Sequence, residues 1–285
     1  VAHMRERRFD LALQWHGGGR NSNPFVRSLG ARVTAGFATP DAPPLDRTLP
    51  YITSLPERLR LIEGARLVGA TTTDDDPRLH VTDADRAELA SVLPDAPDPL
   101  VVIQPGARDP RRRWSARHFA VVADAFAARG ARIAINGTED EAACVNEVCS
   151  RMRHDSINLT GRLSLGALAA LCEHARLMIS NDTGPLHLAR AVGTRNVGIY
   201  WAGNLITHGP VRSWRDRVAA SWRMACPVCE CHCMQHDCEH RVSFVDDVHP
   251  RDVEALALEL YALERNRSLS RSITPNSSHS LPTAY

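Results

Sequence analysis

The sequence has almost no excess of charge of either sign. Its 34 basic side chains, counted as Lys plus Arg, are balanced by 33 acidic ones, which gives a formal net charge of +1 at pH 7. Such a chain lacks the long-range field that gathers polyanions, so we expect no nucleic acid among its partners. Any anionic ligand must be held by local groups.

Long hydrophobic runs are also absent. No stretch approaches the roughly 18 consecutive apolar residues of a membrane-spanning helix. The opening residues, VAHMRERRFD, contain no apolar core of a secretory signal. The sequence therefore predicts a cytoplasmic protein.

A dinucleotide-binding fingerprint is missing as well. No G-x-G-x-x-G follows a predicted strand and opens a helix, which argues against an NAD-dependent oxidoreductase. Hydrophobic residues make up 44% and charged residues 24%, values that exclude collagen-like, coiled-coil and wholly disordered chains. The length of 285 residues is typical of two domains.

Strand-like and helix-like segments alternate through the middle of the chain. Short apolar runs predict buried parallel strands at residues 100–104, 131–137, 156–161, 175–180 and 196–201. The segments between them predict helices, of which one begins at Gly184-Pro185. Because crossovers between parallel strands are right-handed, residues 98 to 202 are expected to form a doubly wound α/β sheet.

The first part of the chain contains fewer such elements. Residues 9–14 predict a strand that ends in His16 and three glycines, and residues 53–69 predict a helix. We therefore expect a partial Rossmann-like domain at residues 1–82 and a nucleotide-binding one at residues 83–265. Residues 266–285 are rich in Ser, Thr and Pro and predict a disordered tail.

Two of the predicted strands run into loops that are suited to a nucleotide. The loop QPGARDPRRRW (104–114) combines Gly106, which allows close backbone approach, with arginines 108, 111, 112 and 113, which can neutralise a diphosphate. Its alternative interpretation is a solvated basic loop. The loop NGTEDE (136–141) offers carboxylates to ribose hydroxyls, and its alternative role is to cap the following helix.

A third loop, NDTGPLH (181–187), is the most specific. It places the Thr183 hydroxyl, the Gly184 backbone and a helix N-terminus at one point, an arrangement that binds anions. His187 follows about one turn into that helix. A single helical histidine is often structural, but beside Asp182 and Thr183 a phosphate or ribose contact is the better interpretation.

These motifs resemble glycosyltransferase family 9, the ADP-heptose:lipopolysaccharide heptosyltransferases. The resemblance rests on QPGAR followed by Arg112 and Trp114, on NGTEDE, on LTGRLSLGALAAL (159–171) and above all on SNDTGPLHLARAVG (180–193). It implies a GT-B architecture, in which two Rossmann-like domains flank a cleft. It further implies an inverting, metal-independent sugar transfer from a nucleoside diphosphate donor, such as ADP-heptose, to a lipopolysaccharide or other cell-surface glycan precursor.

The resemblance also assigns donor-binding residues. It implies that Asp182, Thr183, Gly184 and His187 hold the diphosphate and sugar of the donor, together with the Gly106 loop. Arg112 stands where the family commonly has a phosphate-binding lysine. Glu141 matches a carboxylate that contacts the ribose, and Leu163 matches a position that lines the base. A glycolipid or saccharide acceptor would bring the protein into peripheral contact with the cytoplasmic face of the inner membrane.

One part of the family pattern is not visible here. Family members begin with a strand and a Gly-Asp loop whose aspartate is the general base, and no equivalent precedes Asp10 or His16. Asp10 lies inside a predicted strand, and His16 is placed to contact an acceptor rather than to act as the base. Either the chain is truncated, or it is a noncatalytic or degenerate nucleotide-sugar-binding protein, and the catalytic residues stay unassigned.

A cysteine-rich segment, CPVCECHCMQHDCEH (226–240), forms a separate feature. Cys226 and Cys229 form a C-x-x-C pair, and Cys238 with His240 supplies two further soft ligands, enough for a tetrahedral structural zinc. A cluster of reduced thiols and a set of disulfides are the alternatives. A zinc-stabilised interaction protein is the function that this segment alone would favour, and we expect no cofactor for catalysis.

Overall fold

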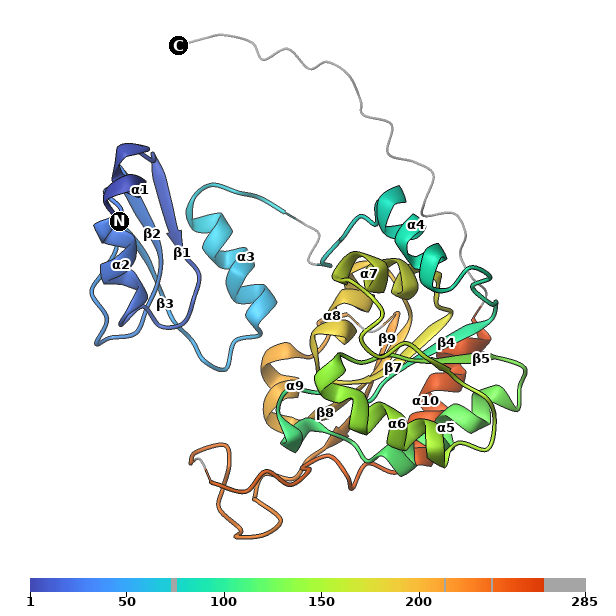
Figure 1. Ribbon diagram of the computed structural model, residues 1–285. Helices are drawn as coiled ribbons and strands as arrows, with labels where there is room; N and C mark the ends of the chain where they lie inside the picture. Colours follow the sequence, from blue (N-terminus) through green and yellow to red (C-terminus); the bar gives the residue numbers. More distant parts are fainter. Residues whose placement is uncertain (73–75, 213, 237, 264–285) are drawn as a thin grey trace.

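The computed structural model describes residues 1–72, 76–212, 214–236 and 238–263 and contains two parallel β-sheets (Figure 1). The tail expected at residues 266–285 lies outside the described residues. The first sheet has three strands and the second has six. Both sheets are accompanied by helices, as expected for an α/β protein.

The first unit is built from short elements. Its strands, β1 (Leu11–Gln14), β2 (Val33–Ala38) and β3 (Arg47–Pro50), pair in parallel in the order β1-β2-β3. Its helices are α1 (Ala2–Glu6), α2 (Ser22–Ser28) and α3 (Glu57–Leu67). The core is formed on the central strand, where Ala35 and Phe37 are buried.

The second sheet consists of six parallel strands. They are β4 (Leu100–Gln104), β5 (Arg132–Ile135), β6 (Ile157–Asn158), β7 (Leu177–Asn181), β8 (Asn196–Trp201) and β9 (Asp216–Ser221). Their order across the sheet is β6-β5-β4-β7-β8-β9, which is the Rossmann order 3-2-1-4-5-6. Successive strands are therefore added towards one edge of the sheet from β4 to β6 and towards the other edge from β7 to β9.

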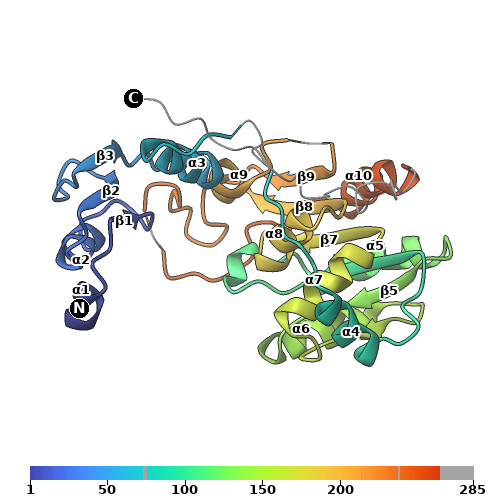
Figure 2. The same cartoon turned by 90° about the horizontal axis from the view of Figure 1, so that it is seen from above.

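Helices cover both faces of this sheet (Figures 1 and 2). They are α4 (Asp83–Val92), α5 (Ala116–Ala127), α6 (Ala142–Arg151), α7 (Leu165–His174), α8 (Gly184–Ala191), α9 (Ala202–His208) and α10 (Pro250–Ala262), with short 3-10 turns at Pro110–Arg112 and Glu139–Glu141.

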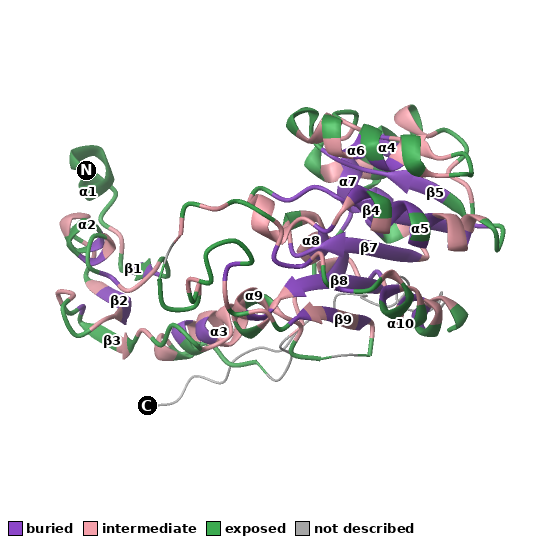
Figure 3. Ribbon diagram, turned by 90° about the horizontal axis from the view of Figure 1, so that it is seen from below, coloured by how far each residue is buried: buried purple, intermediate pink, exposed green. Residues whose placement is uncertain are grey.

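Alternate residues of β4 point to opposite faces of the sheet and enter two separate cores. Val101 and Ile103 pack with α5, α6 and α10, whereas Leu100 and Val102 pack with α4, α7 and α8. All five residues of β4 are buried, and the other central strands are buried as well (Figure 3). The strands that carry the loops of interest are thus held rigidly from both sides.

The strands expected in the second sheet are confirmed, but a sixth strand and the helix before it were not predicted, and neither were α1, α2, β2 and β3 of the first unit. The strand expected at residues 131–137 spans 132–135, and that expected at 156–161 spans only 157–158. The expectation that the sheet ends near residue 202 is wrong, because α9 and a sixth strand, β9, follow. β9 is an edge strand that begins with Asp216 and Arg217, so it lacks the apolar run of a central strand.

The two units contact each other through α3 and α9, which lie side by side in Figures 2 and 3. The connection between them joins the second unit before α4 begins. The Leu79 N–H donates to the Ala191 carbonyl over 2.9 Å, and the Val81 side chain is only 1% exposed in the core below α7.

Candidate functional site

The loops that the sequence singles out meet where the winding reverses. β4 runs into Pro105 and Gly106, and its neighbour β7 runs into Asp182 and Thr183. In an open α/β sheet, ligands bind outside the carboxyl ends of the strands at this position. The fold therefore brings the 104–114 and 181–187 loops to one edge, as predicted from the sequence.

The Asp182 side chain lies at the centre of this edge and is only 1% exposed. Arg112 Nη1 donates to Asp182 Oδ2 over 3.3 Å and to the Asp182 main-chain oxygen over 3.1 Å. On the other side, His187 Nε2 lies 3.2 Å from Asp182 Oδ1. One buried carboxylate thus holds two partly exposed side chains, a guanidinium and an imidazole, beside each other.

The environment keeps Asp182 ionised. Burial raises the pKa of this carboxyl group, but the surrounding groups, first the hydrogen bond from His187 and then nearby charges that include Arg112, together lower it by more. The pKa of Asp182 therefore lies below its ordinary value. Because the carboxylate stays charged at neutral pH, its ion pair with Arg112 is present under physiological conditions.

A buried arginine, Arg190, contacts the ring nitrogen of His187 that does not face Asp182. Arg190 Nη1 lies 3.2 Å from His187 Nδ1, and Arg190 Nε donates to Asp216 Oδ1 over 2.7 Å. Arg190 Nη2 donates to the Tyr200 hydroxyl over 3.1 Å, and burial raises the pKa of Tyr200 to about 12. None of these contacts was predicted from the sequence; those to Tyr200 and Asp216 join α8 to β8 and β9 across the fold.

A second histidine, His208, approaches from the end of α9. Its ring centroid lies 6.4 Å from that of His187. Burial lowers the pKa of His208, and the nearby charges of Arg112 and Arg60 lower it further, whereas Asp182 acts in the opposite direction. His208 is therefore held in its neutral form near the Asp182 carboxylate, and the sequence analysis did not select it.

The start of α8 presents open backbone to the same edge. Thr183 is the N-cap residue in an extended conformation, and its side chain makes no capping hydrogen bond. A Cβ built at Gly184 would meet nothing within 4 Å. Among the described residues no acceptor is found for the Gly184 N–H, so this helix N-terminus is available to an anion.

The Gly106 loop packs tightly against Glu141. A Cβ at Gly106 would collide with the Glu141 carboxylate, so any larger residue there would displace this side chain. The Gln104 amide donates to Glu141 Oε2 over 3.2 Å, and the Thr138 N–H donates to the same oxygen over 3.1 Å. Glu141 thus closes a capping box with Thr138, the alternative role that the sequence analysis left open, and at the same time lies against the β4 loop.

Leu163 lies elsewhere, after the turn that follows β6. It packs, partly buried, against the core formed with α4 and α7. Its contact with a nucleobase stays a prediction.

The four arginines of the 104–114 loop have different partners. Arg111 forms a bidentate pair with Asp109, in which Nη2 donates to Oδ2 over 2.7 Å and Nε to Oδ1 over 3.1 Å, and Arg113 Nε donates to the Ala107 carbonyl over 2.7 Å. Arg108 is exposed. Arg112 is the member of this group that pairs with the buried Asp182, which distinguishes it from its neighbours.

Asn181 is a positioning residue that sequence reasoning missed. It is fully buried; its Oδ1 accepts from the Trp114 N–H over 3.0 Å, and its Nδ2 donates to the Pro105 carbonyl over 2.7 Å. One amide therefore fixes both ends of the arginine-rich loop to the end of β7. The signal for it in the sequence is only its position at the end of an apolar strand.

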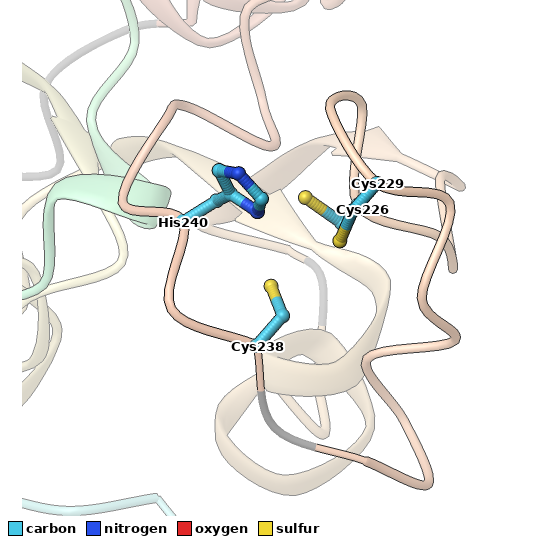
Figure 4. A group of neighbouring side chains, drawn as sticks. All are labelled: Cys226, Cys229, Cys238 and His240. Carbon is cyan, nitrogen blue, oxygen red and sulfur yellow. The ribbon is translucent and has the colours of Figure 1, made fainter.

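The cysteine-rich segment brings four of its side chains together (Figure 4). One ligand atom from each of Cys226, Cys229, Cys238 and His240 lies within 4.8 Å of all the others. These are the four residues that the sequence analysis selected, and the described part of the chain contains no other such group. This arrangement is able to hold a metal ion.

A hollow of about 520 Å³ opens at the end of β1 in the first unit. It is lined by the glycine-rich loop that contains His16, together with Thr39 and Asp41. The sequence analysis placed His16 on the acceptor side, and nothing in its surroundings assigns it a catalytic role. None of the helices in the described ranges combines the length and apolar character that crossing a bilayer requires.

Comparisons with known proteins point to one group. The chain is 34% identical over 125 residues to lipopolysaccharide heptosyltransferase 3 of Escherichia coli, a match that covers 43% of this chain and 36% of the relative. It is 26% identical over 107 residues to lipooligosaccharide heptosyltransferase 2 of Haemophilus influenzae, covering 36% of this chain and 31% of that protein. The match thus spans about a third of the length of these curated relatives.

Solved structures give the same fold. A family 9 glycosyl transferase from Veillonella parvula superposes with a TM-score of 0.73 at 22% identity, covering 91% of this chain and 77% of that one. E. coli ADP-heptose lps heptosyltransferase II superposes with a TM-score of 0.68 at 20% identity, covering 91% and 78%. The GT-B fold with Rossmann-like units is confirmed. The model of glycosyltransferase family 9 (heptosyltransferase) matches residues 2–236, so the chain belongs to this family.

Proposed function

We propose that this chain transfers a heptose from a nucleoside diphosphate donor to a lipopolysaccharide precursor, with the donor bound at the Asp182 edge of the six-stranded sheet. Membership of the family and the names of the curated relatives support the reaction class. A structure of E. coli heptosyltransferase WaaC with ADP, which matches at a TM-score of 0.54 and 18% identity, supports ADP as the nucleotide. A glycolipid acceptor would place the reaction at the cytoplasmic face of the inner membrane.

The diphosphate is bound by groups that converge on one point. Arg112 supplies a fixed positive charge, and the Gly184 N–H supplies an unpaired donor at the positive end of α8. Because Asp182 is buried, it positions Arg112 and His187 rather than facing the donor itself. The sequence contains no lysine, so phosphate recognition by a basic side chain relies on arginine throughout.

The nucleoside extends from this point towards the Gly106 loop. Gly106 lets the backbone and Glu141 approach each other closely, and the carboxylate is held in place by Gln104 and Thr138. A carboxylate fixed in this way accepts hydrogen bonds from ribose hydroxyls. Leu163 is assigned to the base by resemblance to the family.

The chemistry follows from where charge develops. An acceptor hydroxyl attacks the anomeric carbon on the face opposite the diphosphate, and its proton passes to a base. The bond to the diphosphate breaks, the nucleoside diphosphate leaves, and the anomeric carbon of the transferred sugar has inverted configuration. Negative charge builds on the leaving oxygen, where Arg112 and the helix N-terminus are already in place to stabilise it. We propose that these groups replace the metal ion used by other glycosyl transfer sites. The general base is unassigned.

The Arg112–Asp182 pair carries this proposal, and the substitution Arg112→Gln tests it. Loss of a charge-assisted contact costs about 1.5–3 kcal/mol, so ADP affinity measured by calorimetry should fall about 10- to 100-fold. The matched control is Arg132→Gln, which removes the same charge from an exposed position at the opposite end of the strands. Equal ADP affinity in both variants would overturn the site.

Transfer is tested separately by incubating the full chain with ADP-heptose and heptose-deficient lipopolysaccharide, followed by mass spectrometry of the glycolipid. Product formation without added divalent metal supports the proposed enzyme. Tight ADP-heptose binding with no product would identify the chain as a nucleotide-sugar-binding protein instead.

A further inference from the structure

The cysteine-rich segment forms a loop of its own between β9 and α10. Figure 4 shows Cys226 and Cys229 on one limb of this loop and Cys238 and His240 on the other, with their side chains directed towards a common centre. Two ligands therefore come from each limb, and a bound ion would tie the limbs together.

The backbone of the limb that carries Cys226 and Cys229 forms a tight, hydrogen-bonded turn. The Cys226 N–H donates to the Cys231 carbonyl and the Glu230 N–H to the Cys226 carbonyl, each over 2.9 Å. Ala225 and His232 form an antiparallel bridge. Glu230 adopts φ of +59°, a left-handed conformation that is uncommon for a residue with a side chain. This tight turn brings the Cys226 and Cys229 sulfurs to the same side.

The spacing of the four ligand atoms fits a tetrahedral ion. With a Zn–S distance of about 2.3 Å, two sulfurs of a tetrahedral site lie about 3.8 Å apart. The observed separations, all within 4.8 Å, require only a small contraction. Three thiolates and one imidazole close the coordination shell, which is characteristic of structural rather than catalytic zinc.

An independent observation comes from His240. Its Nδ1 atom is buried and has no hydrogen-bond partner in the described structure. A buried nitrogen without a partner is costly unless a ligand satisfies it. Its ring faces the three sulfurs across a common centre (Figure 4), where a metal ion would supply the missing contact.

We propose that Cys226, Cys229, Cys238 and His240 bind one Zn²⁺ as a closed structural site, apart from the donor site. Soft sulfur ligands with one imidazole in a tetrahedral set favour zinc over harder cations such as Mg²⁺. Nearby Cys231, Cys233, His232 and His236 lie outside the ligand group.

The ion orders a loop that has few buried residues of its own. This loop packs against the part of the molecule that carries the donor site. A Cβ built at Gly203, at the start of α9, would lie only 2.8 Å from Met234 Sδ, so the loop packs closely on this helix. After the loop, the Phe244 N–H donates to the Arg111 carbonyl over 2.8 Å. The metal therefore stabilises the packing of this loop on the start of α9 and its link to the backbone of Arg111.

The test measures metal directly on the purified full chain. Elemental analysis should find about one zinc per chain, and Cys238→Ser should lose most of it. Cys231→Ser, the matched control with the same chemical change a few residues away, should keep it. Equal zinc content in these two variants, or zinc far below one per chain in the unmodified protein, would overturn the proposal.

A second measurement covers variants that fail to fold. Cobalt(II) added to the metal-stripped chain should produce the intense visible bands of tetrahedral thiolate coordination, and one equivalent of zinc should abolish them. Absence of these bands, isolation of a Cys226–Cys229 disulfide, or stoichiometric iron in place of zinc would each refute the site. Neither measurement involves the donor, so its outcome is independent of the proposed transfer reaction.

Discussion

Arg190 donates a hydrogen bond from Nη1 to His187 Nδ1 over 3.2 Å, one turn earlier on α8. A guanidinium has only donors, so Nδ1 must accept, and the proton of the neutral imidazole lies on Nε2. That proton points to Asp182 Oδ1. The buried arginine therefore selects the tautomer with which His187 faces the donor site.

The substitution Arg190→Lys is expected to remove the preference of the His187 ring for this tautomer. Lysine keeps the charge opposite Asp216, but it cannot serve Asp216, Tyr200 and His187 together as the guanidinium does. Nitrogen chemical shifts of the His187 ring should show a mixture of tautomers, and ADP affinity should fall several-fold. An unchanged His187 spectrum would show that Arg190 does not set the tautomer; the ring of exposed His80 serves as the internal reference.

The substitution Gly184→Ala should separate stability from binding. Alanine is the better helix former, and its methyl group has open space here, so the free energy of unfolding should stay level or rise by up to about 1 kcal/mol. The same methyl group occupies the space above the helix N-terminus, and ADP affinity should fall at least tenfold. Undiminished affinity would contradict the assignment of the diphosphate to this position.

The substitution Asn181→Ala should destabilise the protein by about 2 kcal/mol, because it leaves the buried Trp114 N–H and Pro105 carbonyl without partners. Urea unfolding measures this change. Asn146→Ala, which removes an exposed amide paired with Asn158, is the control and should change stability by less than about 0.5 kcal/mol. Similar losses in the two variants would show that Asn181 does not clamp the loop.

Stability should fall as the pH drops below 6.5, the ordinary pKa of histidine. Burial lowers the pKa values of His208 and His118 in the folded chain, so the unfolded chain binds more protons in this range. The stability that is present above the histidine pKa of the unfolded chain is therefore lost as the pH falls towards the histidine pKa of the folded chain. Urea titrations across this window should give a shallower slope for His208→Gln than for the unmodified chain, and an equal slope in the two proteins would contradict the prediction.

Much of the fold follows from local sequence patterns. The segments 100–104 and 196–201 are mostly apolar, apart from Gln104 and Asn196 at their ends, and form β4 and β8 with these bounds. β9 could not be found in this way, because its buried and partly exposed residues follow no simple alternation and it pairs only along one edge. Its existence depends on the surface that β8 and α10 provide.

The residues of the candidate site also differ in whether a local sequence pattern could predict them. Asp182, Gly184 and His187 could be selected together because a helix start after a buried strand is a local feature. By contrast, Arg190 pairs with Asp216, which lies 26 residues further along the chain, and no short sequence pattern predicts such a contact. Arg112 was distinguished from its three neighbouring arginines only through the resemblance to the family, because no local pattern shows which of them reaches a carboxylate 70 residues away.

The contact between α3 and α9 has an electrostatic consequence. Arg60 belongs to the three-stranded unit, yet its charge already lowers the pKa of His208, beside the donor edge of the other unit. Coulombic interactions weaken with distance. Any rotation that separates the two helices therefore makes it easier to protonate His208, and any rotation that brings them together makes it harder. The contact between the two units thus contributes to the lowered pKa of this histidine.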